Sequence, residues 1–427
     1  TENKIILEEN KNYYERFSLA VERIRMIHTE LWDQSVTLAD KHLNSYFIKT
    51  SYFALQLNEI YNLSKNNILK TLTESELFHL NQGLYEDIDP AKYETSYTNP
   101  AYAVKRFGAE TGLYLSALYA ELHSNIPNAI EERLFNLTTI FELFIEIYDL
   151  MEDENCEPHE VRNAIYYYVS DYADMTIADR IEMMLDPEHC FARSLIETAD
   201  LDDLRYLYYF GEYIGDNEIG TACHLGEMEE ARIEEMASTY TEGYRNGFAL
   251  YRIDLSCKKT VNIRYRLGFE RMIRAAVRQF RRMGLETTMY RAVGNLIYRN
   301  GRGIKVGYSS GGANPQYDYD HRFDEALIFG KALADRKLAQ QRCAYEEYRE
   351  QAAAFAGPAV IEVFGEDPFV PVAKKESAAY TEKQRKQKLE YQSAASLLSN
   401  EFIPGDQVSF TIIAYPVPEI GRDYGEI

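Results

Sequence analysis

The first part of the chain, up to about residue 240, carries the hydrophobic spacing of successive amphipathic helices. In residues 13–32 the apolar side chains fall near one face of a helix, namely Phe17, Leu19, Val21, Ile24 and Ile27. Further helices are predicted at about 127–150, 158–184, 190–214 and 226–248. Strand-like alternation is nearly absent here, so the pattern predicts an all-helical region.

Local signals at helix ends support this prediction. The sequence LTESELFHLNQGL contains a capping box, in which Thr73 bonds forward to the helix and Glu76 reaches back, and Gly83 is the expected stop. In the stretch from Asn99 to His123, Asn99 is the expected N-cap and Pro100 the first helical residue.

The hydrophobic period changes near residue 258. A strand is predicted around Val261–Tyr265, followed by a basic amphipathic helix that ends at Gly284. Further strands are predicted at 287–293, 304–309, 359–365 and 408–415, and long helices at about 321–355 and 382–402, with Gly357 and Pro358 as the break between helix and strand. Strands that alternate with long helices predict a mostly parallel sheet covered on both faces.

Charge divides the chain at the same place. Residues 1–240 hold 45 acidic and 18 basic residues, a net charge of −27, whereas residues 241–427 hold 23 and 28, a net charge of +5. Such an asymmetry indicates two different surfaces. We therefore predict an α+β multidomain protein, with an acidic all-helical domain at 1–240 and an α/β domain at 241–427.

Composition excludes several classes of protein. The N-terminus lacks the apolar run of a signal peptide, and no apolar stretch approaches the roughly 20 residues that span a bilayer, so we expect a soluble, cytoplasmic protein. The net charge of −22 argues against nucleic-acid binding. Disulfides are not expected, because the five cysteines are widely spaced and odd in number: Cys156, Cys190, Cys223, Cys257 and Cys343.

Catalytic motifs are sparse. The sequence contains no HExxH, no CxxC, no P-loop and no GxGxxG after the first predicted strand. The densest polar cluster is YDYDHRFDEAL, whose members with metal-binding side chains are Asp318, Asp320, His321, Asp324 and Glu325. The simpler interpretation, which we favour, is that Asp318 or Asp320 caps the following helix and the other acids complement its dipole.

Three other features are weaker candidates. The pairs His189–Cys190 and Cys223–His224 would supply four zinc ligands only if the backbone were irregular, because adjacent helical side chains diverge. The lone histidines at 28, 42, 79 and 123 are interpreted as surface or hydrogen-bonded core residues rather than bases. The charged stretch 374–388 is interpreted as a solvated helix start capped by Thr381, rather than as an anion site.

Four segments of the second part of the chain form a recognisable set, namely MASTYTEGYRNGF, the stretch from Lys258 to Ala292, FAGPAVIEVFGEDPF and above all FTIIAYPVPEIG. The strongest marker among them is the turn Tyr415-Pro416-Val417-Pro418 after a strand, and the second is Gly365-Glu366-Asp367-Pro368. Through these segments, about residues 236–427 resemble the first α/β domain of the aminopeptidase T family of leucyl-specific metallopeptidases. The helical part is similar to an N-terminal extension found in one bacterial subgroup of leucyl aminopeptidases.

This resemblance implies a function whose catalytic residues lie elsewhere. In the family, two glutamates, two histidines, a tyrosine and an aspartate bind two divalent metal ions, zinc or cobalt, in the domain after the AYP segment. We therefore assign no catalytic, cofactor-binding or metal residue in 1–427. Glu362, in IEVF, imitates part of the family's Gly-Glu-Val-Phe metal motif, but Ile361 replaces the glycine and the stretch lies upstream of the AYP turn.

The expected function is thus the N-terminal portion of a metal-dependent aminopeptidase, with peptides that have a free N-terminus as substrates and a homodimer as the assembly. The alternative is a noncatalytic helical interaction module fused to a small α/β binding domain. A nucleotide or small-metabolite site at a strand switch point is a third possibility, disfavoured because no glycine-rich phosphate loop is present.

Overall fold

The N-terminal region is built from helices, as predicted. The computed structural model describes residues 4–38, 40–189, 191–291, 296, 307–365, 369–421 and 424. The helices up to residue 251 are α1 (Lys4–Asn10), α2 (Tyr14–Trp32), α3 (Lys41–Lys65), α4 (Glu74–Leu84), α5 (Pro100–Phe107), α6 (Ala109–His123), α7 (Ile126–Ile130), α8 (Leu134–Met151), α9 (Pro158–Asp171), α10 (Ala173–Leu185), α11 (Phe191–Thr198), α12 (Asp216–Glu227) and α13 (Glu230–Tyr251). No strand occurs in the described residues before Thr260.

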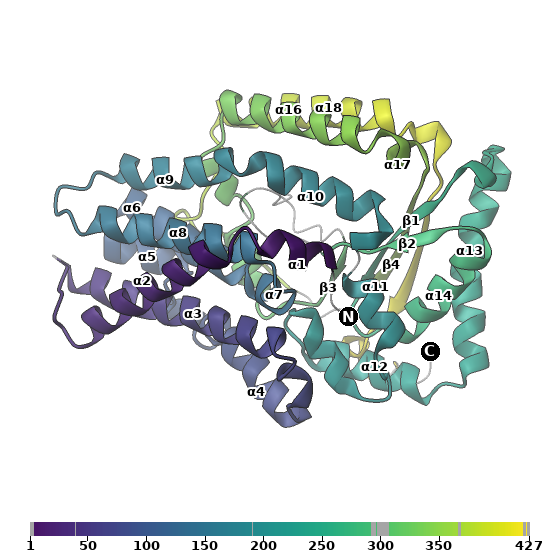
Figure 1. Cartoon of the computed structure of the whole chain (residues 1–427), viewed down its shortest axis with the longest axis horizontal. Coiled ribbons are helices and arrows are strands. Elements are labelled where there is room, and N and C mark those ends of the chain that lie inside the picture. The colour runs from purple at the N-terminus through teal and green to yellow at the C-terminus, as the bar shows by residue number, and fades with distance from the viewer. Residues whose placement is uncertain are drawn as a thin grey trace.

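Helix α2 packs against α3 and α8 through the apolar face that the sequence predicts (Figure 1). Phe17, Val21, Ile24 and Ile27 are buried in the shared core, where the ring of Phe17 stacks on Phe141 of α8. Leu19 is an exception, because 59% of it is exposed. Leu19 is two residues from both Phe17 and Val21, and successive helical residues are rotated by about 100°. The Leu19 side chain therefore points about 200° around the helix from each of them, and its assignment to the buried face was wrong.

The predicted caps form, but several helices end earlier or later than expected. Thr73 and Glu76 make the capping box of α4, and Asn99 caps α5 with Pro100 in its first turn. Gly83 does not stop α4, which continues through Leu84 and is followed by the cap residue Tyr85. The predicted helices at 127–150 and 158–184 are each divided in two, at 131–133 and at Tyr172.

The second part contains a parallel sheet. Its strands are β1 (Thr260–Arg266), β2 (Glu286–Thr288), β3 (Tyr308–Ser309), β4 (Phe355–Phe364) and β5 (Thr411–Pro416). The order is β2-β1-β4-β5, every pairing is parallel, and β3 pairs with the second half of β1. The chain is therefore an α+β protein with an all-helical region followed by a mostly parallel sheet. The predicted strands 287–293 and 304–309 fall partly outside the described residues.

Strand β4 begins four residues before the prediction and includes the expected break. Gly357 has a φ of +109°, and a Cβ atom there would lie 2.0 Å from the carbonyl oxygen of Ser409. The register between β1 and β4 shifts at this point. Gly357 therefore places an irregularity inside the strand instead of ending a helix before it, and its carbonyl accepts a hydrogen bond from Tyr244 of α13.

One face of the sheet is covered and the other is covered only in part. Helix α14 (Glu270–Arg282) packs on β2 and α13 packs on β5, whereas α10 lies against β1 and β2 on the opposite face (Figure 1). Phe410 and Ile412, beside and within β5, are 63% and 52% exposed. The prediction that helices cover both faces is therefore wrong at β5, which is an edge strand.

The long helix predicted at 321–355 is divided into shorter elements. Helix α15 (Pro315–Asp320) is followed by a 3₁₀ turn at Asp324–Leu327 and then by α16 (Lys331–Glu347) and α17 (Arg349–Ala353). The N-cap of α15 is Asn314, not Asp318 or Asp320. Helix α16 packs on α10 and on α18 (Glu382–Phe402), which occupies the predicted range and is capped by Thr381 (Figure 1).

A continuous apolar core joins the helical region to the sheet. It extends from Phe17 in α2 to Val417 after β5 and includes Ile263 of β1 and Tyr244 of α13. Helix α13 spans residue 240, where the charge asymmetry places the domain boundary, and packs on α14 and β5.

Candidate functional site

The carboxyl ends of the parallel strands are where an open α/β sheet places its functional residues. Strand β1 lies inside the sheet, with β2 next to it on one side and β4 on the other. The chain therefore continues from β1 to β2 on the first side and later returns to form β4 on the second. This change of direction makes the carboxyl ends of β1 and β4 the topological switch point. The residues that follow these strands are therefore the first candidates for chemistry.

A buried glutamate lies directly after β1. Glu270 begins α14 and is completely buried. Its Oε2 atom accepts hydrogen bonds from Tyr206 Oη at 3.1 Å and from the Gly268 N–H at 2.8 Å, whereas Oε1 has no hydrogen-bond partner among the described residues. Burial, with a smaller contribution from the charge of Glu218, raises the pKa of Glu270 to about 7 despite these hydrogen bonds. A carboxyl that titrates near neutrality can exchange a proton.

A second buried carboxylate faces this position from α12. Glu218 accepts hydrogen bonds from the N–H of Gly215 at 2.9 Å and of Gly311 at 2.6 Å, so it fixes the start of α12 and the loop after β3. A Cβ atom on Gly268 would lie 2.9 Å from the carbonyl oxygen of Glu218. The backbone of α12 therefore occupies the space above the β1 turn, which a nucleotide phosphate would need.

The two strongest family-like segments lie side by side at this edge. Strands β4 and β5 pair from Ala359 and Thr411 to Phe364 and Pro416, and the Val417 N–H then donates to the Phe364 carbonyl at 3.2 Å. A Cβ atom on Gly365 would lie 2.7 Å from Ile420, so the turn after β4 packs directly on the 3₁₀ turn after β5. Glu366, Asp367 and Pro368 lie outside the described residues.

The acidic cluster at 318–325 does not converge on one point. Asp320 accepts hydrogen bonds from Tyr93 and Gln316 and pairs with Lys374. Asp324 bonds His321 Nδ1 at 2.7 Å, and the other ring nitrogen bonds the carbonyl oxygen of Thr98.

Glu325, the last acid of this cluster, lies between two lysines. It pairs with Lys337 and Lys388 and accepts a hydrogen bond from Tyr380. Each buried acid of the stretch therefore has its own partner, whereas Asp318 is exposed. The favoured capping interpretation was also incomplete, because most of these acids form tertiary contacts.

The other sequence candidates form no common group among the residues that the structure describes. His224 lies with its ring centre 4.8 Å from that of Tyr424, Cys223 is exposed, and Cys190 is outside the described residues. Glu362 is exposed on β4, and Thr381 does cap α18. The stretch 374–388 is not wholly solvated, however, because Lys374 and Lys388 both reach buried carboxylates.

Among the lone histidines, His123 departs from expectation. His28 bonds Ser51 and His79 bonds the Ser75 carbonyl, as surface or satisfied histidines do. His123 is buried between the rings of Phe53 and Tyr119, and neither of its nitrogens has a hydrogen-bond partner among the described residues. Burial lowers the pKa of His123 to about 4. It is therefore a neutral core residue near pH 7.

One group of possible metal ligands was missed in the sequence. The group lies where α10 ends and consists of Glu182, Asp186 and His189. Their ligand atoms are within 4.8 Å of one another. Their spacing of four and three residues places them on one helical face, and this spacing was the available signal. His189 Nε2 lies 2.8 Å from Glu182 Oε1. Burial alone would lower the pKa of His189, but the bond to Glu182 and the nearby acids raise it.

We expect His189→Gln to weaken folding mainly at acidic pH. A histidine whose pKa is raised on folding contributes stability that is complete below its ordinary pKa of about 6.5 and is lost as the pH rises through the folded-state pKa. The loss at about pH 6 should be on the order of 1 kcal/mol, because the site is only partly screened from water. Urea unfolding at several pH values measures it, with the exposed His79→Gln as control. A loss of unfolding free energy in His189→Gln that does not depend on pH would contradict a raised pKa of His189 in the folded protein.

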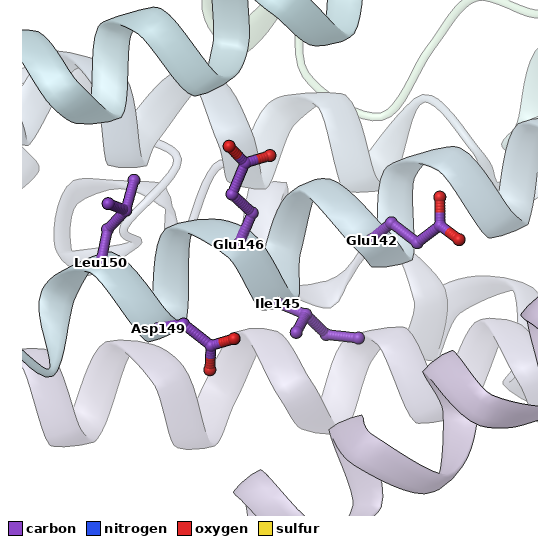
Figure 2. Close-up of a pocket in the computed structure, with 5 residues that line it drawn as sticks. All are labelled: Glu142, Ile145, Glu146, Asp149 and Leu150. Carbon is purple, nitrogen blue, oxygen red and sulfur yellow. The ribbon is translucent and has the colours of Figure 1, made fainter.

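A shallow groove on α8 is a separate surface feature. It has a volume of about 450 Å³ and is lined by Glu142, Ile145, Glu146, Asp149 and Leu150, all of which project from α8 (Figure 2). Glu142 pairs with Arg16 and Asp149 with Arg23, whereas burial raises the pKa of Glu146. The groove therefore combines an acidic rim with two apolar side chains.

No helix in the described ranges is long and apolar enough to cross a membrane. Comparisons of the chain with protein-family models, with curated proteins and with solved structures find no match.

Proposed function

We propose that this chain is the N-terminal, noncatalytic portion of a cytoplasmic metal-dependent aminopeptidase. The observation that carries the proposal is the adjacency of the two family-like segments. The strand that leads to Gly365 and the strand that leads to Tyr415-Pro416 pair in parallel, and their following turns pack on each other. Segments that carry one family's pattern would be expected to form one structural unit, and these two do so at the carboxyl edge of the sheet.

The metal-binding residues belong to a following domain in this proposal. The family resemblance implies two divalent metal ions, zinc or cobalt, bound by glutamates, histidines, a tyrosine and an aspartate. Among the described residues the one group of three possible ligands is Glu182, Asp186 and His189, which has a single histidine and no partner group for a second ion. These residues do not fit the paired centre, so no catalytic step is assigned to them. In this proposal the residues of this chain form the parallel sheet and the helical region that packs beside it.

The test compares two proteins on peptides with an N-terminal leucine. The chain 1–427 and the same chain with its native continuation are each assayed with added zinc or cobalt for release of free leucine. We expect release only from the longer protein, and only with metal. Failure of the longer, metal-loaded protein to release N-terminal residues from a panel of peptides would reject the proposal. Stoichiometric zinc or cobalt retained by 1–427 would show that the ligands are not all elsewhere.

A homodimer is proposed with the enzyme. The exposed side chains of Phe410 and Ile412 beside and within the edge strand β5 support it, because an apolar edge strand is a template for pairing with another chain. Light scattering on the chain 1–427 in solution should give a mass twice the 49.5 kDa of one chain. A monomer at all concentrations would reject the dimer but leave the peptidase proposal intact.

The acidic groove on α8 favours the second candidate function, a helical interaction module. Glu142 and Asp149 of its rim are paired with Arg16 and Arg23, so Glu146 is the acid that would attract a basic peptide. Absence of peptidase activity together with salt-sensitive binding of basic peptides, lost in Glu146→Lys, would favour this alternative over the enzyme.

A further inference from the structure

Residues 369–376, which we call the strap, lie between β4 and α18 and form no helix or strand. The apolar side chains of Phe369, Val370 and Val372 are exposed. The hydrogen bonds and the ion pair that join the strap to the other described residues are made by Val372 and Lys374.

The ammonium group of Lys374 enters a site with three recognition features. It pairs with Asp320 Oδ2, donates to Asn99 Oδ1 at 3.0 Å and lies 4.6 Å from the centre of the Tyr93 ring. Asp320 is completely buried, and Asn99 and Tyr93 are more than nine-tenths buried. A primary ammonium has three N–H donors and is attracted to the face of an aromatic ring, so its chemistry matches this set. We call Tyr93, Asn99 and Asp320 the ammonium site.

The ammonium site is held in place by residues outside the strap. Tyr93 Oη donates to Asp320 Oδ2 at 2.8 Å, and Gln316 Nε2 donates to Oδ1 at 2.8 Å. Asn99 Nδ2 donates to the Tyr93 carbonyl, while its Oδ1 also caps α5. The acceptor atoms are therefore positioned by the helical region and α15, and lifting the strap would leave them in place.

The strap is also bound through its backbone, as an extended peptide would be. Gln316 Nε2 donates to the Val372 carbonyl and Gln316 Oε1 accepts from the Val372 N–H, both at 2.8 Å. The Val372 side chain is exposed and contributes no specificity. The contacts thus recognise the backbone N–H and carbonyl of Val372 and, two residues later, the ammonium group of Lys374.

We propose that Tyr93, Asn99 and Asp320 form a binding site for a primary ammonium group, and that Lys374 occupies this site in cis as a displaceable plug. Binding of an external amine requires Lys374 to leave, so the external ligand shifts the strap from the closed to the open state. A lysine side chain and the amino terminus of a peptide share this chemistry. The proposal does not depend on the aminopeptidase assignment.

Lys374→Ala in the chain 1–427 tests the site by chemical rescue. The variant leaves the charge of buried Asp320 uncompensated, and we expect its melting temperature to fall by about 5 °C. Millimolar n-butylammonium, which mimics a lysine side chain, should restore most of the loss with saturation. Leucinamide, which mimics a peptide amino terminus, forms the second arm. Stabilisation by one amine alone supports the site and identifies its source, stabilisation by both supports a site for primary amines of either source, and stabilisation by neither overturns the proposal.

Three controls separate the site from general effects of salt and of the substitution. Tetramethylammonium, which has no N–H donor, should not stabilise Lys374→Ala. Lys375→Ala removes a neighbouring lysine that is 91% exposed and should neither lower the melting temperature nor create a response to amines. Adding Asp320→Asn to Lys374→Ala should abolish the rescue. A rescue that persists in this double variant would overturn the assignment of Asp320.

A measurement on the unsubstituted protein keeps the proposal testable if Lys374→Ala fails to fold. Amine that displaces Lys374 should speed hydrogen exchange in residues 369–376 while exchange in α5 stays unchanged. Exchange in the strap that does not respond to either amine would reject displacement of the plug.

Discussion

Replacing Glu270 with glutamine is expected to stabilise the protein above neutral pH. The carboxyl of Glu270 has its pKa raised from 4.5 to about 7 by burial, so the folded protein binds this proton more tightly than the unfolded chain does. Folding must therefore weaken as the pH rises from about 4.5 to about 7, and the full penalty of about 3 kcal/mol applies above that range. Glutamine stays neutral at every pH and removes the penalty.

The geometry allows glutamine to replace the protonated acid closely. Its side-chain oxygen can accept the bonds from Tyr206 and Gly268 that now end on Oε2. Its amide nitrogen takes the place of Oε1, which has no hydrogen-bond partner among the described residues. The two N–H groups left without an acceptor lower the stability of the variant by the same amount at every pH, so the pH-dependent part of the difference reports the charge alone.

Denaturant unfolding of both proteins at several pH values measures the effect. The stability difference between Glu270→Gln and the parent should grow by roughly 2 kcal/mol between about pH 5.5 and about pH 8.5. The exposed Glu346→Gln is the matched control and should give a difference near zero throughout. Parallel stability curves for Glu270→Gln and its parent would show that Glu270 is ionised without penalty.

Short-range signals explain the parts of the fold that the sequence predicts well. The capping box at Thr73, the Asn99-Pro100 start and the helix after Thr381 are each specified by neighbouring residues, and all three form. The charge-rich α18 even has the predicted bounds. Such elements need no knowledge of distant contacts.

Long-range contacts explain the failures. The acids of residues 318–325 were interpreted as a helix start, but Asp320 and Glu325 are paired with Lys374 and Lys388, more than 50 residues away. These pairings favour α15 and a 3₁₀ turn over one long helix. Gly357 likewise lies within a strand because Tyr244 and Ser409 pack around it.

The candidate residues at the sheet edge were hidden for the same reason. In the sequence, Glu270 is one acid in RLGFER, a stretch notable only for lacking further glycines. Its burial results from the placement of Tyr206 and of the α12 start beside it. The open face at β5 was missed because α16 packs on α10, and α18 packs on α16, instead of on the sheet.

The substitution Glu325→Gln is expected to destabilise the protein strongly. Glu325 and Lys337 each have side chains that are 2% exposed, and Lys388 and Tyr380 also bond the carboxylate. Burial alone would raise the pKa of Glu325, but the two lysines outweigh it and lower the pKa. Glutamine would remove the carboxylate that the two lysines share, and breaking a buried ion pair in this way costs about 3–5 kcal/mol.

The exposed pair of Arg342 and Glu401 provides the matched comparison. Glu401→Gln removes the same charge from a pair whose side chains are each 50% exposed, and its cost should not exceed about 1 kcal/mol. Urea unfolding of both variants gives the two values directly. Equal losses would mean that burial does not govern the strength of these pairs.

The pH dependence of Glu325→Gln gives a second, independent check. Burial lowers the pKa of Lys337 even with Glu325 present, so removal of the carboxylate should let this lysine lose its proton more easily. The destabilisation should therefore shrink as the pH is raised towards the ordinary pKa of lysine, because a neutral amine is tolerated where an ammonium is not. A loss that stays constant up to alkaline pH would place its origin in packing rather than in the buried charge.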